Sequence, residues 1–83
     1  MYKIIFEKKA FDFFKKLDKP IQERIGRKIQ ELSNDPQVGI PLVGNLTGLW
    51  KLRIGDYRAI YQIINGELIV LVLKIGHRKN IYD

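Results

Sequence analysis

The chain has 83 residues, of which 46% are hydrophobic and 29% charged, and its formal net charge at pH 7 is +6. This length allows one hydrophobic core, so we expect a single domain spanning residues 1–83. The absence of cysteine excludes disulfides and thiolate metal sites, and one histidine does not make a protein-only zinc site, so we expect no metal and no cofactor.

The same composition indicates where the protein works and what it meets. No apolar run approaches the ~20 residues of a transmembrane helix, and the amino-terminal residues lack the cleavage-site pattern of a signal peptide. We therefore expect a cytoplasmic protein that does not enter a membrane. The excess of cations favours an acidic partner, above all a nucleic acid, because neutralising phosphates releases counterions.

The first half of the sequence predicts a short strand followed by two helices. Residues 2–6 are typical of a strand, and residues 8–17 place apolar side chains three and four apart, as a helix does. Pro20 suits the first turn of a second helix, whose apolar stripe runs from Ile21 to Leu32. The short connection predicts an antiparallel helical hairpin. Residues 37–48 are expected to form an ordered loop.

The last third predicts three antiparallel strands. Residues 49–54 and 57–64 alternate on either side of Gly55-Asp56, which suits a two-residue turn. Asn65-Gly66 signals a second tight hairpin, and the apolar run that follows is typical of a central strand. The expected fold class is α+β: an antiparallel sheet, formed by the amino-terminal strand and a three-stranded meander, with the helical hairpin packed on one face.

Two-residue turns set the register, and the register decides which side chains share a face. The expected cross-strand partners are Arg53 and Arg58, Leu52 and Ala59, and Trp50 and Tyr61 in the first hairpin, and Ile63 and Leu68, Tyr61 and Val70, and Arg58 and Leu73 in the second. The face against the helices then holds Trp50, Leu52, Ile54, Tyr57, Ala59, Tyr61, Ile63, Leu68, Val70 and Val72. The opposite face holds Lys51, Arg53, Arg58, Ile60, Gln62, Ile69, Leu71 and Leu73.

Arg53 and Arg58 thus form a like-charged cross-strand pair, which disfavours folding by ~0.2–1 kcal/mol. A bound anion would neutralise both, so these arginines and Lys51 are candidate RNA-binding residues. The plainer interpretation is that exposed strands carry cations as protection against edge pairing. The segment after the last strand adds further potential cations, expected at the same end as Arg58: His77, Arg78 and Lys79.

Other conspicuous side chains have simpler interpretations. Aromatic residues of the helix and strand patterns are expected in the core: Phe11, Phe13, Phe14 and Trp50. The cations of the second helix form a hydrated face or touch phosphates: Arg24, Arg27 and Lys28. Tyr82 has no evident core to join and is able to stack on a base. Apolar residues of the second sheet face form a patch suited to a partner protein: Ile60, Ile69, Leu71 and Leu73.

With these elements in this order, the chain resembles the RelE/ParE toxin superfamily over essentially its whole length. The most specific stretches are residues 45–53, 56–62 and 76–82, above all the Tyr57-Arg58-x-x-Tyr61 strand and the glycine-basic-arginine segment Gly76-His77-Arg78. The resemblance implies a toxin of a type II toxin–antitoxin system, a RelE-like mRNA interferase that cleaves messenger RNA in the ribosomal A site. It also implies a cognate antitoxin that inhibits the toxin in a heterotetrameric complex.

The resemblance implies roles for individual residues. Lys51 and Arg53 match the basic pair around the scissile phosphate, with Lys51 the candidate base. Arg58 matches the phosphate-binding arginine, Arg78 the arginine linked to leaving-group chemistry, and Tyr82 the tyrosine that stacks on a base.

Some positions and functions stay open. His77 stands where several relatives have lysine, and no convincing glutamate matches the glutamate–histidine pair of other relatives. ParE-like toxins keep the fold but poison DNA gyrase, generally without the nuclease residues, so the retained basic set favours the RelE side. A non-catalytic RNA- or ribosome-binding module is the third interpretation.

Overall fold

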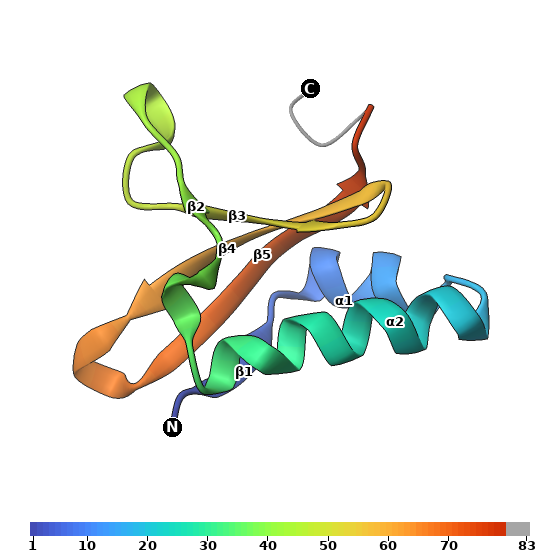
Figure 1. Ribbon diagram of the computed structural model, residues 1–83, viewed down its shortest axis with the longest axis horizontal. Helices are drawn as coiled ribbons and strands as arrows, with labels where there is room; N and C mark the ends of the chain where they lie inside the picture. The colour runs from blue at the N-terminus through green and yellow to red at the C-terminus, as the bar shows by residue number, and fades with distance from the viewer. Residues whose placement is uncertain (80–83) are drawn as a thin grey trace.

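The structure is a computed structural model that describes residues 1–79, and it confirms the α+β class. Two helices lie on one face of a five-stranded sheet whose strand order is β1-β5-β4-β3-β2 (Figure 1). In chain order the elements are β1 (Lys3–Phe6), α1 (Lys8–Lys15), α2 (Lys19–Gln30), β2 (Ile40–Pro41), β3 (Trp50–Ile54), β4 (Tyr57–Ile64) and β5 (Ile69–His77).

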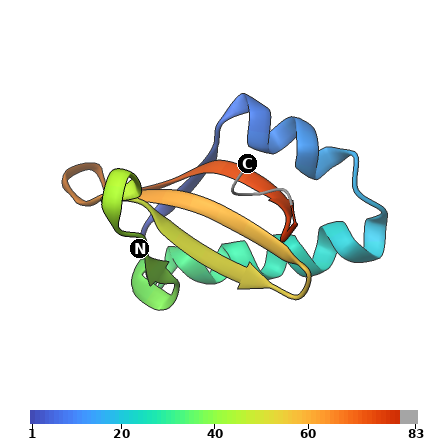
Figure 2. The same ribbon diagram turned by 90° about the horizontal axis from the view of Figure 1, so that it is seen from above.

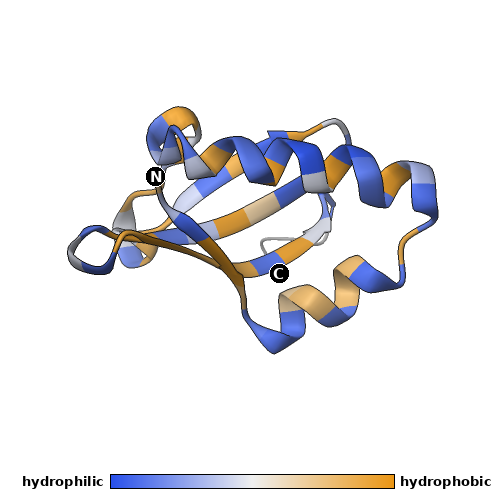
Figure 3. Ribbon diagram, turned by 90° about the horizontal axis from the view of Figure 1, so that it is seen from below, coloured by the Kyte–Doolittle hydropathy of each residue, from blue (hydrophilic) through white to orange (hydrophobic). Residues whose placement is uncertain are grey.

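The helices form where the apolar spacing predicts them. Pro20 lies in the first turn of α2, where its missing N–H breaks no helical hydrogen bond. α1 ends at Lys15, two residues before the predicted end, and a short turn leads to α2 (Figure 2). Apolar and polar positions alternate around both helices (Figure 3). The buried core between helices and sheet consists of Ala10, Ile25, Ile29, Leu32, Leu52, Ile54, Ala59, Tyr61, Val70, Val72 and Ile75.

The first hairpin has the predicted register. Arg53 pairs with Arg58, Leu52 with Ala59 and Trp50 with Tyr61. Gly55 has a φ of 60°, a left-handed conformation that glycine adopts without steric strain. The local turn chemistry therefore determines this pairing.

The second hairpin differs from the prediction. Residues 65–67 form a 3₁₀ turn, and Leu68 rather than Gly66 takes the left-handed conformation, with φ 54°. The loop is thus four residues long, and Ile64 pairs with Ile69. The three predicted pairs Ile63–Leu68, Tyr61–Val70 and Arg58–Leu73 are wrong. The observed pairs are Ile63–Val70, Tyr61–Val72 and Arg58–Gly76.

An irregularity in β5 accounts for part of that difference. Tyr61 pairs with Val72 while Ile60 pairs with Lys74, so Leu73 is an extra residue, a β-bulge. The longer loop shifts the register by two residues and leaves the faces unchanged. The bulge shifts it by one more, which turns Lys74 to the face that the helices do not cover.

The two edges of the sheet also hold features that the sequence did not predict. β1 joins the sheet as expected; it pairs with β5 in parallel, so the prediction of a purely antiparallel sheet is wrong and the sheet is mixed. The predicted loop contains the two-residue strand β2, which pairs with Trp50 and Lys51 of β3. Tyr61 holds the start of this loop, because its hydroxyl donates to the Pro36 carbonyl (2.7 Å) and accepts from the Gly39 N–H (3.2 Å).

Three predictions of burial are wrong. Leu68 is 51% exposed because it lies in the loop. Phe11 of α1 is 48% exposed, with its ring edge to face with Phe6 and beneath the Lys15 ammonium. Ile60 is only 8% exposed although it lies on the uncovered face. Its cross-strand neighbours are Lys51 and Lys74, and the aliphatic stem of a lysine can cover apolar surface.

Candidate nucleic-acid interface

The uncovered face of the sheet carries a row of arginines near the β3–β4 turn. Arg53 of β3 lies opposite Arg58 of β4, and Arg58 lies opposite Gly76 of β5. Gly76, the third position of the row, has no side chain and is itself buried. The like-charged pair that the sequence predicts, Arg53 and Arg58, is therefore present on this face.

A second row of cations lies one step further from the turn. Lys51, Ile60 and Lys74 are cross-strand neighbours in that order. Sequence reasoning identified Lys51 and missed Lys74, because an uninterrupted strand would leave it off this face. The available signal was its position as the one charged residue within the apolar run of residues 68–75. We call Lys51, Arg53, Arg58 and Lys74 the strand-face cluster.

Hydrogen bonds hold the Arg58 side chain at the turn. Its Nη1 donates to the carbonyl of Gly55 and to that of Tyr57, both at 2.9 Å. A guanidinium has five N–H donors in a rigid fork, more than these two bonds use. The bonds therefore orient the group, and donors remain with which it could bind an anion.

The segment after β5 returns to the same turn, as the sequence predicts. The backbone N–H of Arg78 donates to the Asp56 carbonyl at 2.8 Å. The Arg78 Nε lies 3.9 Å from the Asp56 carboxylate, in an exposed pair. Arg78 and Arg58 are thus attached to the two neighbouring residues of one turn. Tyr82 lies outside the described residues.

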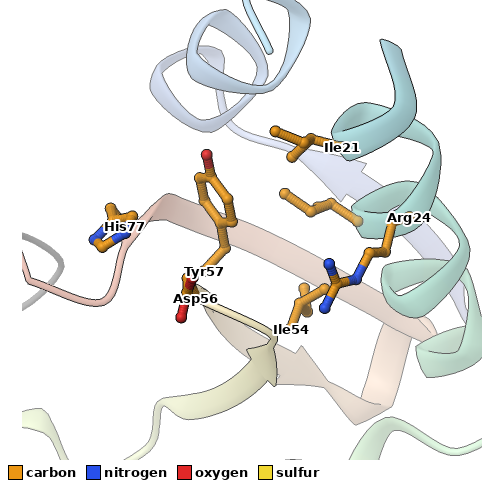
Figure 4. Close-up of a pocket in the computed structure, with 7 residues that line it drawn as sticks. Ile21, Arg24, Ile54, Asp56, Tyr57 and His77 are labelled. Carbon is orange, nitrogen blue, oxygen red and sulfur yellow. The ribbon is translucent and has the colours of Figure 1, made fainter. Parts of the chain in front are cut away.

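His77 lies on the other side of the sheet. It pairs with Tyr57, and the two rings meet edge to face with their centroids 5.6 Å apart. Both side chains line a hollow of about 250 Å³ that faces the helices, together with Arg24 and Asp56 (Figure 4). His77 thus lies at the same end of the sheet as Arg58, as the sequence predicts, and alternation along β5 turns its ring to the helix side. Lys79 is exposed, and its N–H donates to His77 Nδ1 at 3.3 Å.

The described residues match neither the pattern of a metal site nor that of a membrane-spanning helix. Within residues 1–79, no three His, Asp or Glu side chains are grouped as metal ligands. Among the same residues no helix is long and apolar enough to cross a membrane. The dominant electrostatic feature of the uncovered sheet face is its group of cations.

The likeness to known proteins extends over nearly the whole chain. Residues 4–82 match the family model described as the ParE toxin of the type II toxin–antitoxin system parDE. The chain is a toxin of the RelE/ParE superfamily. It is 26% identical over 80 residues to the mRNA interferase toxin RelE of Escherichia coli K12, an alignment that covers 94% of this chain and 84% of that protein.

Solved structures of RelE toxins share this fold. The RelBE2 toxin–antitoxin complex of Mycobacterium tuberculosis contains a chain that is 32% identical, with a TM-score of 0.86 and coverage of 93% of this chain and 98% of that one. The intact E. coli RelBE complex contains one that is 25% identical, with a TM-score of 0.79 and coverage of 93% and 96%. The chain is therefore a type II toxin–antitoxin toxin of the RelE, YoeB and ParE kind.

Proposed function

We propose that this RelE/ParE-superfamily toxin is a ribosome-dependent endonuclease of messenger RNA that uses no metal. The observation that carries the proposal is the strand-face cluster, in which Arg53 and Arg58 lie side by side with Lys51 one step away. A gyrase-binding toxin has no need of a phosphate site on this face. The name of the E. coli relative, mRNA interferase, supports the same chemistry.

RNA contains its own nucleophile, and the proposed reaction uses it. The 2′-hydroxyl loses its proton to a neutral Lys51 amine, and the 2′-oxygen forms a bond to the neighbouring phosphorus. The bond from phosphorus to the 5′-oxygen then breaks, and that oxygen takes a proton. The products are a 2′,3′-cyclic phosphate and a 5′-hydroxyl end.

The arginines act on the charge that develops during this step. Arg53 and Arg58 stabilise the crowded dianionic phosphorane, and Arg78 protonates or stabilises the departing 5′-oxygen. Tyr82 stacks on a base and His77 and Lys79 contribute cationic or polar contacts to RNA. The neutral form of Lys51 requires a site from which water is excluded, and the ribosomal A site supplies it.

The proposed inhibitory partner is a cognate antitoxin, in a heterotetramer of two toxins and two antitoxins. Two chains similar to this one were solved in RelBE toxin–antitoxin complexes. Beside the strand-face cluster, the same face presents half-buried apolar side chains suited to a partner segment: Ile5, Ile64, Ile69 and Leu71. An antitoxin that covers this area would also block access to the cations.

The experiment is a primer-extension assay on message translated by purified ribosomes. Arg58→Ala and Arg78→Ala are each expected to abolish cleavage, with unchanged antitoxin binding and unfolding midpoint. A mutant that cuts at the wild-type rate would disprove its assigned role. A gyrase supercoiling assay tests the second candidate, which the ParE family match supports: supercoiling inhibition without RNA cleavage would replace our proposal.

A further inference from the structure

A second group of cations lies at the edge of the sheet, on α2. Arg24 and Lys28 are four residues apart and so share one face of this helix. With Arg53 of β3 they line a hollow of about 400 Å³, whose other lining residues are Ile54 and Gly55. We call this the α2–β3 hollow. The third cation of α2, Arg27, does not line it.

Two features of the backbone bring these three cations together. β2 pairs only with Trp50 and Lys51, so within the described residues no strand covers the edge of β3 at Arg53. The exposed Arg53 side chain can therefore contact a ligand on the uncovered sheet face or at the edge of β3. Gly55 leaves space for the Arg24 guanidinium, which a Cβ atom at this position would meet. Figure 4 shows Arg24 extending from α2 towards Ile54 at the end of β3.

The charges of the hollow are not balanced from within it. Its lining contains three cations and no carboxylate among the described residues. Lys28 has an exposed ion pair with Glu31 on its own helix, at 3.5 Å, which water screens. Asp56 lies with Arg24 around the neighbouring hollow of Figure 4, outside the α2–β3 hollow. An anion is the natural complement, and a planar guanidinium beside an ammonium suits phosphate oxygens.

We propose that the α2–β3 hollow binds a phosphate of an RNA backbone, adjacent to the strand-face cluster, with Arg53 shared between the two sites. This inference rests on the proposed function for the class of ligand, RNA. It does not require cleavage. It distinguishes Arg24 and Lys28, which contact phosphate, from Arg27, which is an ordinary solvated arginine of the same helix.

The test compares Arg24→Gln with the matched control Arg27→Gln, which removes the same charge from the same helix. One arm measures binding of a fluorescent 12-nucleotide single-stranded RNA by anisotropy across a salt series. The other measures co-sedimentation with ribosomes that carry no message, and so reports ribosomal RNA. Arg24→Lys keeps the charge, and Arg58→Ala removes the proposed cleavage chemistry while leaving the hollow intact.

We expect Arg24→Gln to weaken binding about three- to tenfold in at least one arm and to lower the salt slope by ~0.7–0.9, the contribution of one phosphate contact. Arg24→Lys should restore the slope, and Arg27→Gln should change it by less than half as much. The arm that responds identifies message or ribosomal RNA as the source.

Three results would overturn the inference. The first is an equal salt slope for the Arg24 and Arg27 variants in both arms. The second is no RNA binding by the wild type in either arm, and the third is an Arg24 effect confined to antitoxin or gyrase binding. If RNA binding depends on Arg24 but the protein never cleaves RNA, only the proposed nuclease activity is refuted and the phosphate site stands. The unfolding midpoint of each variant shows that it is folded.

Discussion

The N–H of Arg78 donates a 2.8 Å hydrogen bond to the carbonyl of Asp56, which attaches the segment after β5 to the turn between β3 and β4. The Asp56 carboxylate also lies 3.9 Å from the Arg78 side chain. The backbone hydrogen bond does not depend on that carboxylate. A mutation of Asp56 can therefore remove the negative charge beside Arg78 and keep the bond that positions the Arg78 backbone.

Asp56→Asn should therefore strengthen RNA binding while leaving stability almost unchanged. The ion pair is 52% and 70% exposed, so its loss should change the free energy of unfolding by less than ~0.5 kcal/mol. Removing one negative charge beside the bound phosphate is worth up to ~1 kcal/mol in water, or about fivefold in affinity. Fluorescence anisotropy at low salt measures it, and the gain should disappear near 0.5 M salt. Weaker RNA binding by Asp56→Asn would mean that the carboxylate is needed to orient the Arg78 side chain.

Lys74→Gln should weaken RNA binding although the sequence did not mark this residue. Lys74 shares a cross-strand row with Lys51, so it contributes a cation to the same face. The expected loss is one phosphate contact, seen as a salt slope lower by ~0.7 for a single strand. Lys9→Gln is the matched control, because Lys9 is exposed on α1 and α1 packs on the opposite face. Equal slopes for the two variants would exclude Lys74 from the interface.

Tyr61→Phe should lower the free energy of unfolding by ~1–3 kcal/mol. The fully buried hydroxyl donates to the Pro36 carbonyl and accepts from the Gly39 N–H, and both partners lose a hydrogen bond without it. Urea denaturation measures the change. Tyr2→Phe is the control, because the Tyr2 hydroxyl bonds an exposed Asn65 side chain and water can replace it. Similar losses in both variants would mean that Tyr61 does not anchor the loop.

The same tyrosine predicts a pH dependence. Burial raises the pKa of the Tyr61 phenol above its usual value of 10.0; the negative charge of Asp35 adds to this shift and the Gly39 hydrogen bond opposes it. The folded chain then holds the phenol proton more tightly than the unfolded chain. The contribution of this group to the free energy of unfolding is therefore fully present below pH 10 and decreases as the pH rises above 10. The stability difference between wild type and Tyr61→Phe should narrow between pH 9 and 11 in urea titrations. A constant difference would contradict a buried, shifted phenol.

Local sequence accounts for the helices, the first hairpin and the site residues on it. Gly55-Asp56 closes a turn between two alternating strands, so counting outward from it places Arg53 opposite Arg58 and both on the uncovered face. Only residues close in sequence take part in that decision. The same reasoning about Gly55-Asp56 places Arg78 near the turn once β5 is known to pair with β4.

Tertiary packing decided the rest. The Asn65-Gly66 signal was outweighed by a longer loop and the bulge at Leu73, which together keep Val70, Val72 and Ile75 in the core and turn Lys74 outward. The sequence alone determined which cations this protein has and that Lys51, Arg53 and Arg58 share one hairpin. Only the fold decided that Lys74 joins them, that the His77 ring faces the helices and that Arg24 and Arg53 line one hollow. Those positions depend on burying apolar residues that are distant along the chain.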